Sequence, residues 1–550
     1  MPKHKILASV CFFAWMLLSN VGAVEAAQER PNILFAFADD WGRHASVYAK
    51  VDGPGTENDL IRTPHFDALA QEGVLFNHAY VNAPSCTPCR SSLLSGQHFW
   101  RTGRGAILQG AVWDSSIPTW PLLLQDAGYH IGFSFKVWSP GTPRDAPFGG
   151  KANAYRAAGG RYNAFSQTVS RMVRSGKPLE DAKAEMAAEV RKNFEGFLGK
   201  KKEGQPFAYW FGPTNVHRKW IKGSGKALWN IDPDQLKGRM PPFLPDVPEV
   251  RQDLADYMGE AMAFDMSLGV LVGELKKRGL YDNTLIAVSG DHGPAGFPHG
   301  KCNLYDYGTR VALSISGPGV KKQNAGRVLD DFVSLPDLAP TFLEAAGVKI
   351  PKVMTARSIW PSLRSETAAG LADASRTQVF TGRERHVAVA RPGRLPYPSR
   401  AIRTRDHLLI VNFRPDRWPL GDPYDLGTDR EPGVAKLTSS TFVTLADEDA
   451  GPTKAWIVSN RKDPKVRPFF EHAYGKRPKL QLFDMNKDPH QMKNVADDPA
   501  YADVLKDLRG RLMAELETTK DPRVVDNGSY FENPPLAGQP RGRRKNKKRP

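Results

Sequence analysis

The 550-residue sequence predicts an α/β protein, with a large domain built on a mostly parallel sheet and a smaller C-terminal α+β domain. Apolar strand-like runs alternate with helical patterns over roughly the first 300 residues, an order typical of parallel sheets flanked by helices. Beyond about residue 360 the chain changes to arginine-, proline- and aspartate-rich segments with short strand candidates. The length also exceeds what one hydrophobic core normally organises, so we expect two domains.

The large domain contains five expected strands and four expected helices in alternating order. The strands are expected at 33–38, 74–81, 130–135, 206–213 and 283–290. A first helix follows Pro64 and ends at Gly73, as the preference for an early proline and a terminal glycine predicts. Further helices are expected at 119–127 and 178–200, and at 250–275, where apolar residues recur every three or four positions before Gly279.

The smaller domain has two clear strand candidates, at 407–413 and 480–485, and a closing helix at 500–516 with one apolar face. We therefore divide the chain into a catalytic domain at 28–365, a C-terminal domain with a short antiparallel sheet at 366–525, and a disordered basic tail at 526–550. No internal repeats are visible.

The first 27 residues have the pattern of a secretory signal peptide. Lys3 and Lys5 precede an apolar run at 6–18, and small residues at 24–27 offer a cleavage site. We expect an exported protein that is periplasmic or extracellular, or lysosomal in a eukaryote. No later run approaches the roughly 18 apolar residues of a membrane span, so none is predicted.

The formal charge of +17 is concentrated partly in the last ten residues, 541–550, which hold seven basic residues and no acid. A like-charged block of this kind either binds polyanions or is a solvated tail. For an exported chain, acidic polysaccharide or an anionic surface is a better partner than nucleic acid. Both interpretations of the tail remain open.

Cys86 and Cys89 form a Cys-x-x-Cys pair with a proline between them. A redox pair of this spacing normally belongs to a small βαβ domain, which this chain does not predict. A zinc site needs two further thiol or histidine ligands nearby, and Cys302 is the one thiol left after signal cleavage. Three thiols do not make a disulfide framework.

A third interpretation comes from the wider segment CTPCRSSLLSG, which resembles the sulfatase signature Cys-x-Pro-Ser-Arg followed by four residues and Thr-Gly. The first cysteine, the proline, Arg90 and Gly96 agree, whereas Cys89 replaces serine and Ser95 replaces threonine. The resemblance implies an alkaline-phosphatase-like fold and conversion of Cys86 to formylglycine (3-oxoalanine). A formylglycine-generating or anaerobic sulfatase-maturating enzyme would be the partner that converts it.

Other segments resemble the same family over nearly the whole mature chain. ADDWG and SGDHG resemble its two metal-binding motifs, and GYHIGFSFKVW, GPTNVHRKW and HGKCNLYDYG resemble its active-site segments. The resemblance implies one Ca²⁺ ion held by Asp39, Asp40, residue 86, Asp291 and His292. It implies catalytic roles for Cys86, Arg90, Lys136, His217 and Lys301.

Among the subgroups, the N-sulfoglucosamine sulfohydrolases (heparan sulfamidases) are similar in the segments NVHR, GFPHGKCNLY and FTGRERH. Two positions differ: Trp138 stands where the family often has histidine, and Lys301 where the sulfamidase has arginine. The choice between N- and O-sulfate therefore stays open. Candidate substrate-binding residues near these segments are His299, Arg383, Glu384, Arg385 and His386.

The expected chemistry follows from the charge of a sulfate ester, which repels an anionic nucleophile. Oxygen ligands from aspartates suit a hard cation such as Ca²⁺, which offsets that charge. A geminal diol at residue 86 can attack sulfur with one hydroxyl and collapse through the other, releasing sulfate from a sulfated-enzyme intermediate. Fixed lysine charges stabilise the oxygens, and His217 either binds sulfate or protonates the leaving oxygen or nitrogen.

The resemblance thus implies an exported sulfuric ester hydrolase that removes sulfate from sulfated carbohydrate, such as a glycosaminoglycan, acting from chain ends. Two rival functions remain. A phosphatase or phosphodiesterase of the same superfamily would normally use serine or threonine with two zinc ions and several histidines. A non-enzymatic polyanion-binding relative would leave Cys86 unconverted.

Overall fold

The computed structural model describes residues 30–320 and 325–532. From Pro31 onward, the described chain forms one compact unit. The predicted signal peptide at 1–27 and residues 533–550 of the predicted basic tail lie outside the described residues. The first part of that tail, 526–532, is ordered: it ends in a helix, Ser529–Glu532, in which Phe531 is buried. Among the described residues, no helix is long and apolar enough to cross a membrane.

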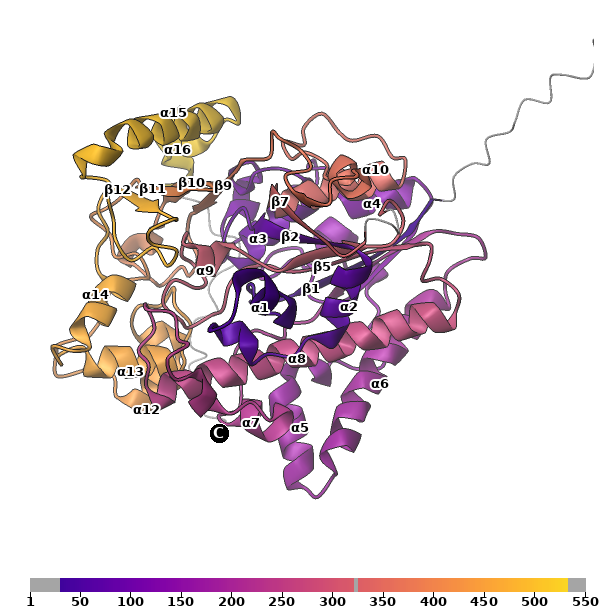
Figure 1. The fold of residues 1–550 in the computed structure, drawn as a ribbon, viewed down its shortest axis with the longest axis horizontal. Helices are drawn as coiled ribbons and strands as arrows, with labels where there is room; N and C mark the ends of the chain where they lie inside the picture. Colours follow the sequence, from indigo (N-terminus) through magenta and orange to yellow (C-terminus); the bar gives the residue numbers. More distant parts are fainter. Residues whose placement is uncertain (1–29, 321–324, 533–550) are drawn as a thin grey trace, which may run out of the picture. The chain divides into compact units, whose positions relative to one another are not determined.

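The larger sheet has eight strands in the order β3-β4-β1-β5-β6-β2-β7-β8. Figure 1 labels β1, β2, β5 and β7 of this sheet. All neighbouring strands pair in parallel except β6, which is antiparallel to both β5 and β2. The strands are β1 Asn32–Ala38, β2 Val74–Tyr80, β3 His130–Phe135, β4 Phe207–Gly212, β5 Thr284–Gly290, β6 Leu313–Ser316, β7 Arg327–Ser334 and β8 Ala369–Gly370. The mostly parallel sheet is as the sequence predicts.

The central strand β1 is buried on both faces, as expected for a strand covered by helices on each side. Leu34, Ala36 and Ala38 belong to one hydrophobic core, and Ile33, Phe35 and Phe37 alternate with them into the other. The first core is completed mainly by α2, α5, α6 and α8, and the second by α3, α4 and α10.

The helices of the large domain agree with the sequence expectation where the apolar period is clear. The structure has α1 Ser46–Asp52, α2 Pro64–Glu72, α3 Cys86–Ser95, α4 Trp120–Asp126, α5 Phe165–Arg174, α6 Leu179–Leu198, α7 Ser224–Trp229, α8 Pro248–Lys277, α9 Asp306–Thr309, α10 Leu338–Ala345 and α11 Trp360–Arg364. The long helix α8 runs across one face of the sheet (Figure 1).

The second sheet has four antiparallel strands in the order β12-β11-β10-β9. They are β9 Gln378–Arg383, β10 Ser399–Thr404, β11 His407–Asn412 and β12 Leu480–Asp484. The remaining helices are α12 Val434–Ser439, α13 Pro452–Asn460, α14 Arg467–Tyr474, α15 Ala502–Thr518, α16 Pro522–Val525 and α17 Ser529–Glu532. Leu508, Leu512 and Leu516 of α15 pack on the sheet through Ile402 and Leu409. The predicted α+β character of this region is confirmed, and the boundary at 365/366 stays a prediction.

Candidate active site

The predicted metal ligands meet at the carboxyl ends of two adjacent strands. β1 pairs with β5 in a register that sets Ala38 opposite Gly290, so the residues after each strand lie side by side. Asp39 and Asp40 follow β1, and Asp291 follows β5. The backbone N–H of Asp40 donates to Asp291 Oδ1 at 2.8 Å. Open α/β sheets place their binding sites at this edge.

Cys86 is the first residue of α3 and faces the same cluster. Its Sγ lies 3.5 Å from His292 Nε2 and 4.0 Å from Asp40 Oδ1. His292 Nε2 is also 3.4 Å from Asp40 Oδ1 and 3.5 Å from Asp291 Oδ1. The structure therefore brings all five predicted ligands, Asp39, Asp40, Cys86, Asp291 and His292, into one buried cluster.

Arg90 lies one helical turn after Cys86 and bridges two carboxylates of the cluster, one after each strand. Its Nε donates to Asp291 Oδ2 at 2.9 Å, and its Nη2 donates to Asp39 Oδ1 at 3.0 Å. Lys136, directly after β3, donates from Nζ to both oxygens of Asp39 at 2.6 Å. Arg90 and Lys136 thus fix the carboxylates in place and offset part of their charge.

These cations decide the ionisation of Asp39. Burial alone would raise its pKa, but the charges of Lys136 and Arg90 bring that pKa well below the usual value. Burial, together with the neighbouring Asp39, raises the pKa of Asp291. Closely spaced buried carboxylates of this kind gain from a further positive charge between them.

Lys301 contacts Asp40 of the cluster and has a second acidic partner that the sequence did not indicate. Its Nζ lies 3.2 Å from Asp40 Oδ1 and 3.2 Å from Asp449 Oδ2. Burial alone would lower the pKa of Lys301, but Asp40 and Asp449 raise it well above its usual value. The acid-rich stretch 447–449 is the one local signal that could have drawn attention to Asp449.

The surroundings of the described thiols disfavour the thiolate form. Cys86, Cys89 and Cys302 are all free and buried. Burial raises the pKa of Cys86 and of Cys89 well above the usual value, and the nearby carboxylates of Asp39 and Asp291 add to this. A reactive redox pair needs the opposite shift, toward a thiolate. Cys302 packs in an apolar cluster with Leu420 and Leu437 instead of joining a thiol-rich metal site.

Two histidines lie at the edge of the cluster. His217 follows β4; its Nε2 lies 3.7 Å from Asp40 Oδ2, and its side chain is 31% exposed. The predicted substrate residue His386 is buried, and its Nδ1 lies 2.8 Å from the hydroxyl oxygen of Ser85. Burial, with the charge of Lys301, lowers the pKa of His386 to about 3, so it is neutral in this position.

Trp138, which occupies the position where the family often has histidine, is packed away from the cluster. Its indole Nε1 donates to Ser91 Oγ at 2.7 Å, and its ring lies edge-on to Trp113. The side chain is fully buried. Trp138 therefore has no group with which to transfer a proton.

Two of the other predicted substrate residues form ion pairs inside the protein. Arg383 pairs with Asp447 at 2.6 Å, and Glu384 pairs with Arg400 at 2.9 Å, both inside the protein. These two side chains are engaged in buried ion pairs and are not brought to the metal cluster. Their charges alone could not reveal this, since the sequence does not show which partners packing supplies.

His299 is also placed in packing contacts. Its ring stacks on Phe243 and Tyr305, and its Nε2 lies 2.6 Å from Nε2 of His472 in α14. The fifth residue of the predicted set, Arg385, has no acidic partner among the described residues.

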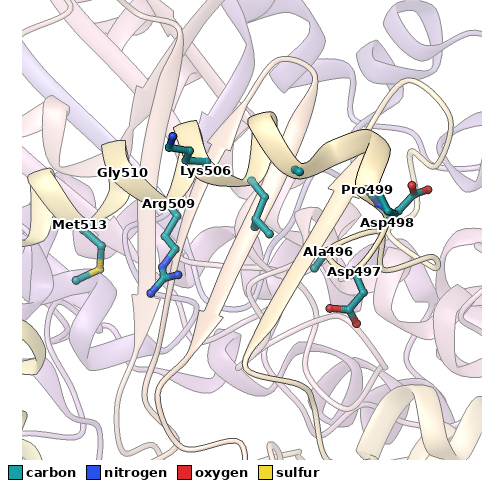
Figure 2. Close-up of a pocket in the computed structure, with 10 residues that line it drawn as sticks. Ala496, Asp497, Asp498, Pro499, Lys506, Arg509, Gly510 and Met513 are labelled. Atoms are coloured by element: carbon teal, nitrogen blue, oxygen red, sulfur yellow. The ribbon is translucent and has the colours of Figure 1, made fainter.

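A surface pocket lies elsewhere, along α15 (Figure 2). It is lined by Asp497, Asp498, Lys506, Arg509 and Met513, among others. None of the predicted site residues lines it, so the chemistry of this chain is not located there.

The sulfatase family model matches residues 31–348, which is more than half of the chain. Among curated proteins, the chain is 28% identical to N-sulphoglucosamine sulphohydrolase of Homo sapiens over 533 residues, covering 91% of this chain and 93% of that protein. It is 25% identical to an N-acetylglucosamine-6-O-sulfatase of Bacteroides thetaiotaomicron, covering 76% of this chain and 84% of the relative.

Solved structures share the fold. One, described as a complex with its substrate D-glucosamine-2-N,6-O-disulfate, superposes with a TM-score of 0.57 at 19% identity and covers 90% of this chain and 98% of its own. Another, described in connection with glycosaminoglycan metabolism by Bacteroides thetaiotaomicron, has a TM-score of 0.63 at 18% identity and covers 92% and 100%. These matches confirm the resemblance and the fold class that the sequence predicts.

Proposed function

The chain belongs to the sulfatase family, and from this premise we propose that it removes sulfate from sulfated saccharides with residue 86 as the nucleophile. The observation that supports this most directly is the position of Cys86 Sγ, 3.5 Å from His292 and 4.0 Å from Asp40, within the carboxylate cluster. A nucleophile at this position attacks sulfur next to the carboxylates of the cluster and the cationic side chains that contact them.

The cluster fits a divalent cation held mainly by oxygen. The donor atoms of Asp39, Cys86 and Asp291, and those of Asp40, Cys86 and His292, lie within 4.8 Å of one another in each group. Carboxylate-rich sets of this kind favour Ca²⁺, and we propose one such ion held by Asp39, Asp40, Asp291, His292 and residue 86. A bound cation supplies positive charge that offsets the sulfate oxygens.

The environment of Cys86 disfavours the unmodified thiol as the nucleophile. Because burial and Asp39 raise the pKa of the thiol well above its usual value, the side chain as encoded is a protonated, weak nucleophile. The motif around it matches the family signature at the residues quoted above. We propose that a maturating enzyme oxidises Cys86, and that the hydrated aldehyde attacks sulfur.

The remaining residues of the site position and stabilise the reacting group. Lys136, which pairs with Asp39, and Lys301, which pairs with Asp40, place two fixed positive charges beside the carboxylates, where they can bind sulfate oxygens as charge develops. Arg90 holds Asp39 and Asp291 in register with residue 86. His217 is partly exposed and can protonate the leaving oxygen or nitrogen as product departs.

The substrate class rests on the named relatives. Two of them are described as acting on glucosamine sulfates, one at nitrogen and one at the 6-oxygen. We propose a sulfated glucosamine-containing saccharide as substrate, with cleavage of either an S–N or an S–O bond. Cys86 is only 3% exposed, so a terminal sulfated sugar reaches it more readily than the middle of a polymer. We also propose export of the mature protein and contact of its basic tail with polyanions.

The test combines three measurements on purified, exported protein. Mass spectrometry of the residue-86 peptide reports conversion of the cysteine, and an aryl sulfate together with defined glucosamine sulfates reports sulfate release. Measuring sulfate release after removal and re-addition of Ca²⁺ shows whether the reaction requires this ion. Sulfate release by a protein with an unmodified thiol contradicts the proposal. Binding of sulfated saccharide without any turnover supports the non-enzymatic alternative.

A further inference from the structure

The segment 383–403 contains two arginines whose charge is not matched by any acidic partner among the described residues. Four other arginines of this segment each pair with a buried or partly buried carboxylate: Arg383 and Arg391 with Asp447, Arg400 with Glu384 and Asp521, and Arg403 with Asp306. Arg385 and Arg394 form no ion pair within the described chain. For Arg385 this is costly, because its side chain is buried and an unpaired buried charge is destabilising.

A third unpaired arginine lies beside Arg385. Arg385 Nη2 donates to the carbonyl of Gln109 at 2.9 Å, and Arg104 Nη2 donates to the carbonyl of the next residue, Gly110, at 3.3 Å. Consecutive carbonyls thus hold the two guanidinium groups next to each other. The Nε atoms of both arginines are buried without a hydrogen-bond partner. The described protein therefore leaves part of the hydrogen-bonding capacity of each guanidinium group unsatisfied.

The electrostatics agree with this geometry. Burial, and then the positive charges of Arg394 and Arg104, lower the pKa of Arg385 to about 10. The repulsion among the three guanidinium groups is therefore not offset within the described protein. An anion bound between them would relieve it.

The arginines adjoin the proposed sulfate site. Backbone hydrogen bonds from Leu108 to Arg385 and from Gln109 to His386, each 3.1 Å, hold the two segments together. His386 in turn lies 2.8 Å from the hydroxyl oxygen of Ser85, which precedes Cys86. Exposure increases away from this point, since Arg385 is buried, Arg104 is half-buried and Arg394 is exposed. The three arginines together thus reach solvent through Arg104 and Arg394.

We propose that Arg104, Arg385 and Arg394 form an anion subsite that binds a second acidic group, a sulfate or a carboxylate, of the saccharide whose sulfate is removed at residue 86. Planar guanidinium groups with unsatisfied hydrogen-bonding capacity suit both oxyanions, since both accept paired N–H bonds. This inference rests on the proposed function and assigns to the same site a preference for substrates with more than one negative charge.

The first experiment compares substrates that differ in the second anion. kcat/KM is measured for an aryl sulfate, for glucosamine 2-N,6-O-disulfate, and for a uronate-containing disaccharide with a single sulfate. In R385Q and R104Q we expect about a 10- to 100-fold loss on at least one of the doubly anionic substrates, and less than about threefold on the aryl sulfate. The substrate that loses more identifies the second group as sulfate or carboxylate.

Control variants separate a binding role from a folding role. R394Q alters an exposed side chain, so its fold is retained, and we expect a loss of about two- to fivefold confined to the doubly anionic substrates. R430Q removes an exposed arginine that pairs with Asp425 in a different part of the chain. It should leave kcat/KM for each doubly anionic substrate, relative to that for the aryl sulfate, at the wild-type value. R385K, which keeps the charge, should recover part of the activity lost in R385Q.

A binding measurement keeps the subsite testable if no turnover is seen. In C86A protein, the dissociation constant of glucosamine 2-N,6-O-disulfate or of the uronate disaccharide should rise about 10- to 100-fold when R385Q is added. An equal loss on all substrates, or unchanged binding and unchanged kcat/KM in every arginine variant, overturns the subsite. An inactive wild type whose binding still depends on Arg385 would instead refute the proposed hydrolysis.

Discussion

The carboxylate of Asp449 lies 3.2 Å from the ammonium nitrogen of Lys301, so a residue from the C-terminal part of the chain contributes a charge to the site. Asp447, two residues earlier, is fixed by ion pairs with Arg383 and Arg391. The ion pairs of the smaller domain thus hold Asp449 against Lys301. The C-terminal region therefore shapes the site as well as supporting the fold.

Replacing Asp449 with asparagine should strengthen binding of free sulfate. Asp449 competes with sulfate oxygens for Lys301, and its side chain is only 20% exposed, so solvent screens the pair weakly. We expect the inhibition constant of inorganic sulfate to fall about tenfold in D449N, equivalent to ~1.4 kcal/mol. Product-inhibition kinetics with R430Q as the control measure this. An unchanged or weaker inhibition would show that Asp449 does not limit access to Lys301.

The two cysteines of the signature should behave differently on substitution. C86A removes the proposed nucleophile and should lower kcat by about 10³-fold or more. C89S restores the residue usual in the family at a position buried in the second core, and we expect activity within about threefold of wild type. Mass spectrometry should show an aldehyde at residue 86 in C89S. Equal losses in both variants would mean that conversion depends on Cys89.

Removal of the metal should abolish activity and lower stability together. At a calcium concentration 100 times the dissociation constant, a single site contributes about 2.7 kcal/mol to the free energy of unfolding. We expect a chelator to lower Tm by several degrees and excess Ca²⁺ to restore both properties. D291N should lose this calcium-dependent shift, because it removes one of the carboxylate ligands. If Zn²⁺ but not Ca²⁺ restored activity and Tm after chelation, the assignment of the site to Ca²⁺ with oxygen ligands would be contradicted.

Much of the candidate metal site was predictable because the sequence patterns that indicate its residues are local. Asp39, Asp40 and Asp291 each follow a buried apolar run, and parallel strands bring their carboxyl ends to one edge. The helices with a clear apolar period, such as α8, were equally accessible from the sequence. The pairing of β1 with β5, by contrast, is a long-range contact that no local pattern specifies.

The charged residues around the cluster were harder to assign, because their roles depend on partners far away in the chain. Arg383 and Arg385 are two residues apart and look alike in sequence, yet one pairs with Asp447 and the other has no acidic partner among the described residues. Strands β9 and β10 were also missed, since their polar residues conceal the alternating pattern and their neighbours supply the pairing.

Stability should fall at mildly acidic pH through His78. Burial, and then the charges of Arg310 and Arg403, lower the pKa of His78 to about 2, although Asp330 lies 3.7 Å away. The unfolded value is near 6.5, so below that pH the unfolded chain binds more protons. This contribution is complete above pH 6.5 and is lost as the pH falls, by up to about 1.4 kcal/mol per pH unit.

Urea unfolding at pH 7.5 and 5.0 measures this effect. H78F keeps the ring that stacks on Phe332 at 4.6 Å and should reduce the pH dependence by about 1–2 kcal/mol over this interval. H490N, at an exposed histidine, is the matched control and should leave the pH dependence as in wild type. If the free energy of unfolding changed with pH equally in wild type and H78F, groups other than His78 would control the loss of stability at low pH.

Arg383 provides the sharpest contrast between a structural and a substrate-binding arginine. Its guanidinium donates to Asp447 and to the carbonyls of Cys302 and Pro419, all inside the protein. R383Q leaves Asp447 with one arginine partner fewer, and breaking a buried pair costs about 3–5 kcal/mol. We therefore expect a clear drop in Tm and in the urea midpoint. The ratio of kcat/KM between doubly and singly charged substrates should stay at the wild-type value, in contrast to R385Q. A change in that ratio without loss of stability would place Arg383 in contact with substrate, because a residue that only anchors Asp447 cannot distinguish the second anion.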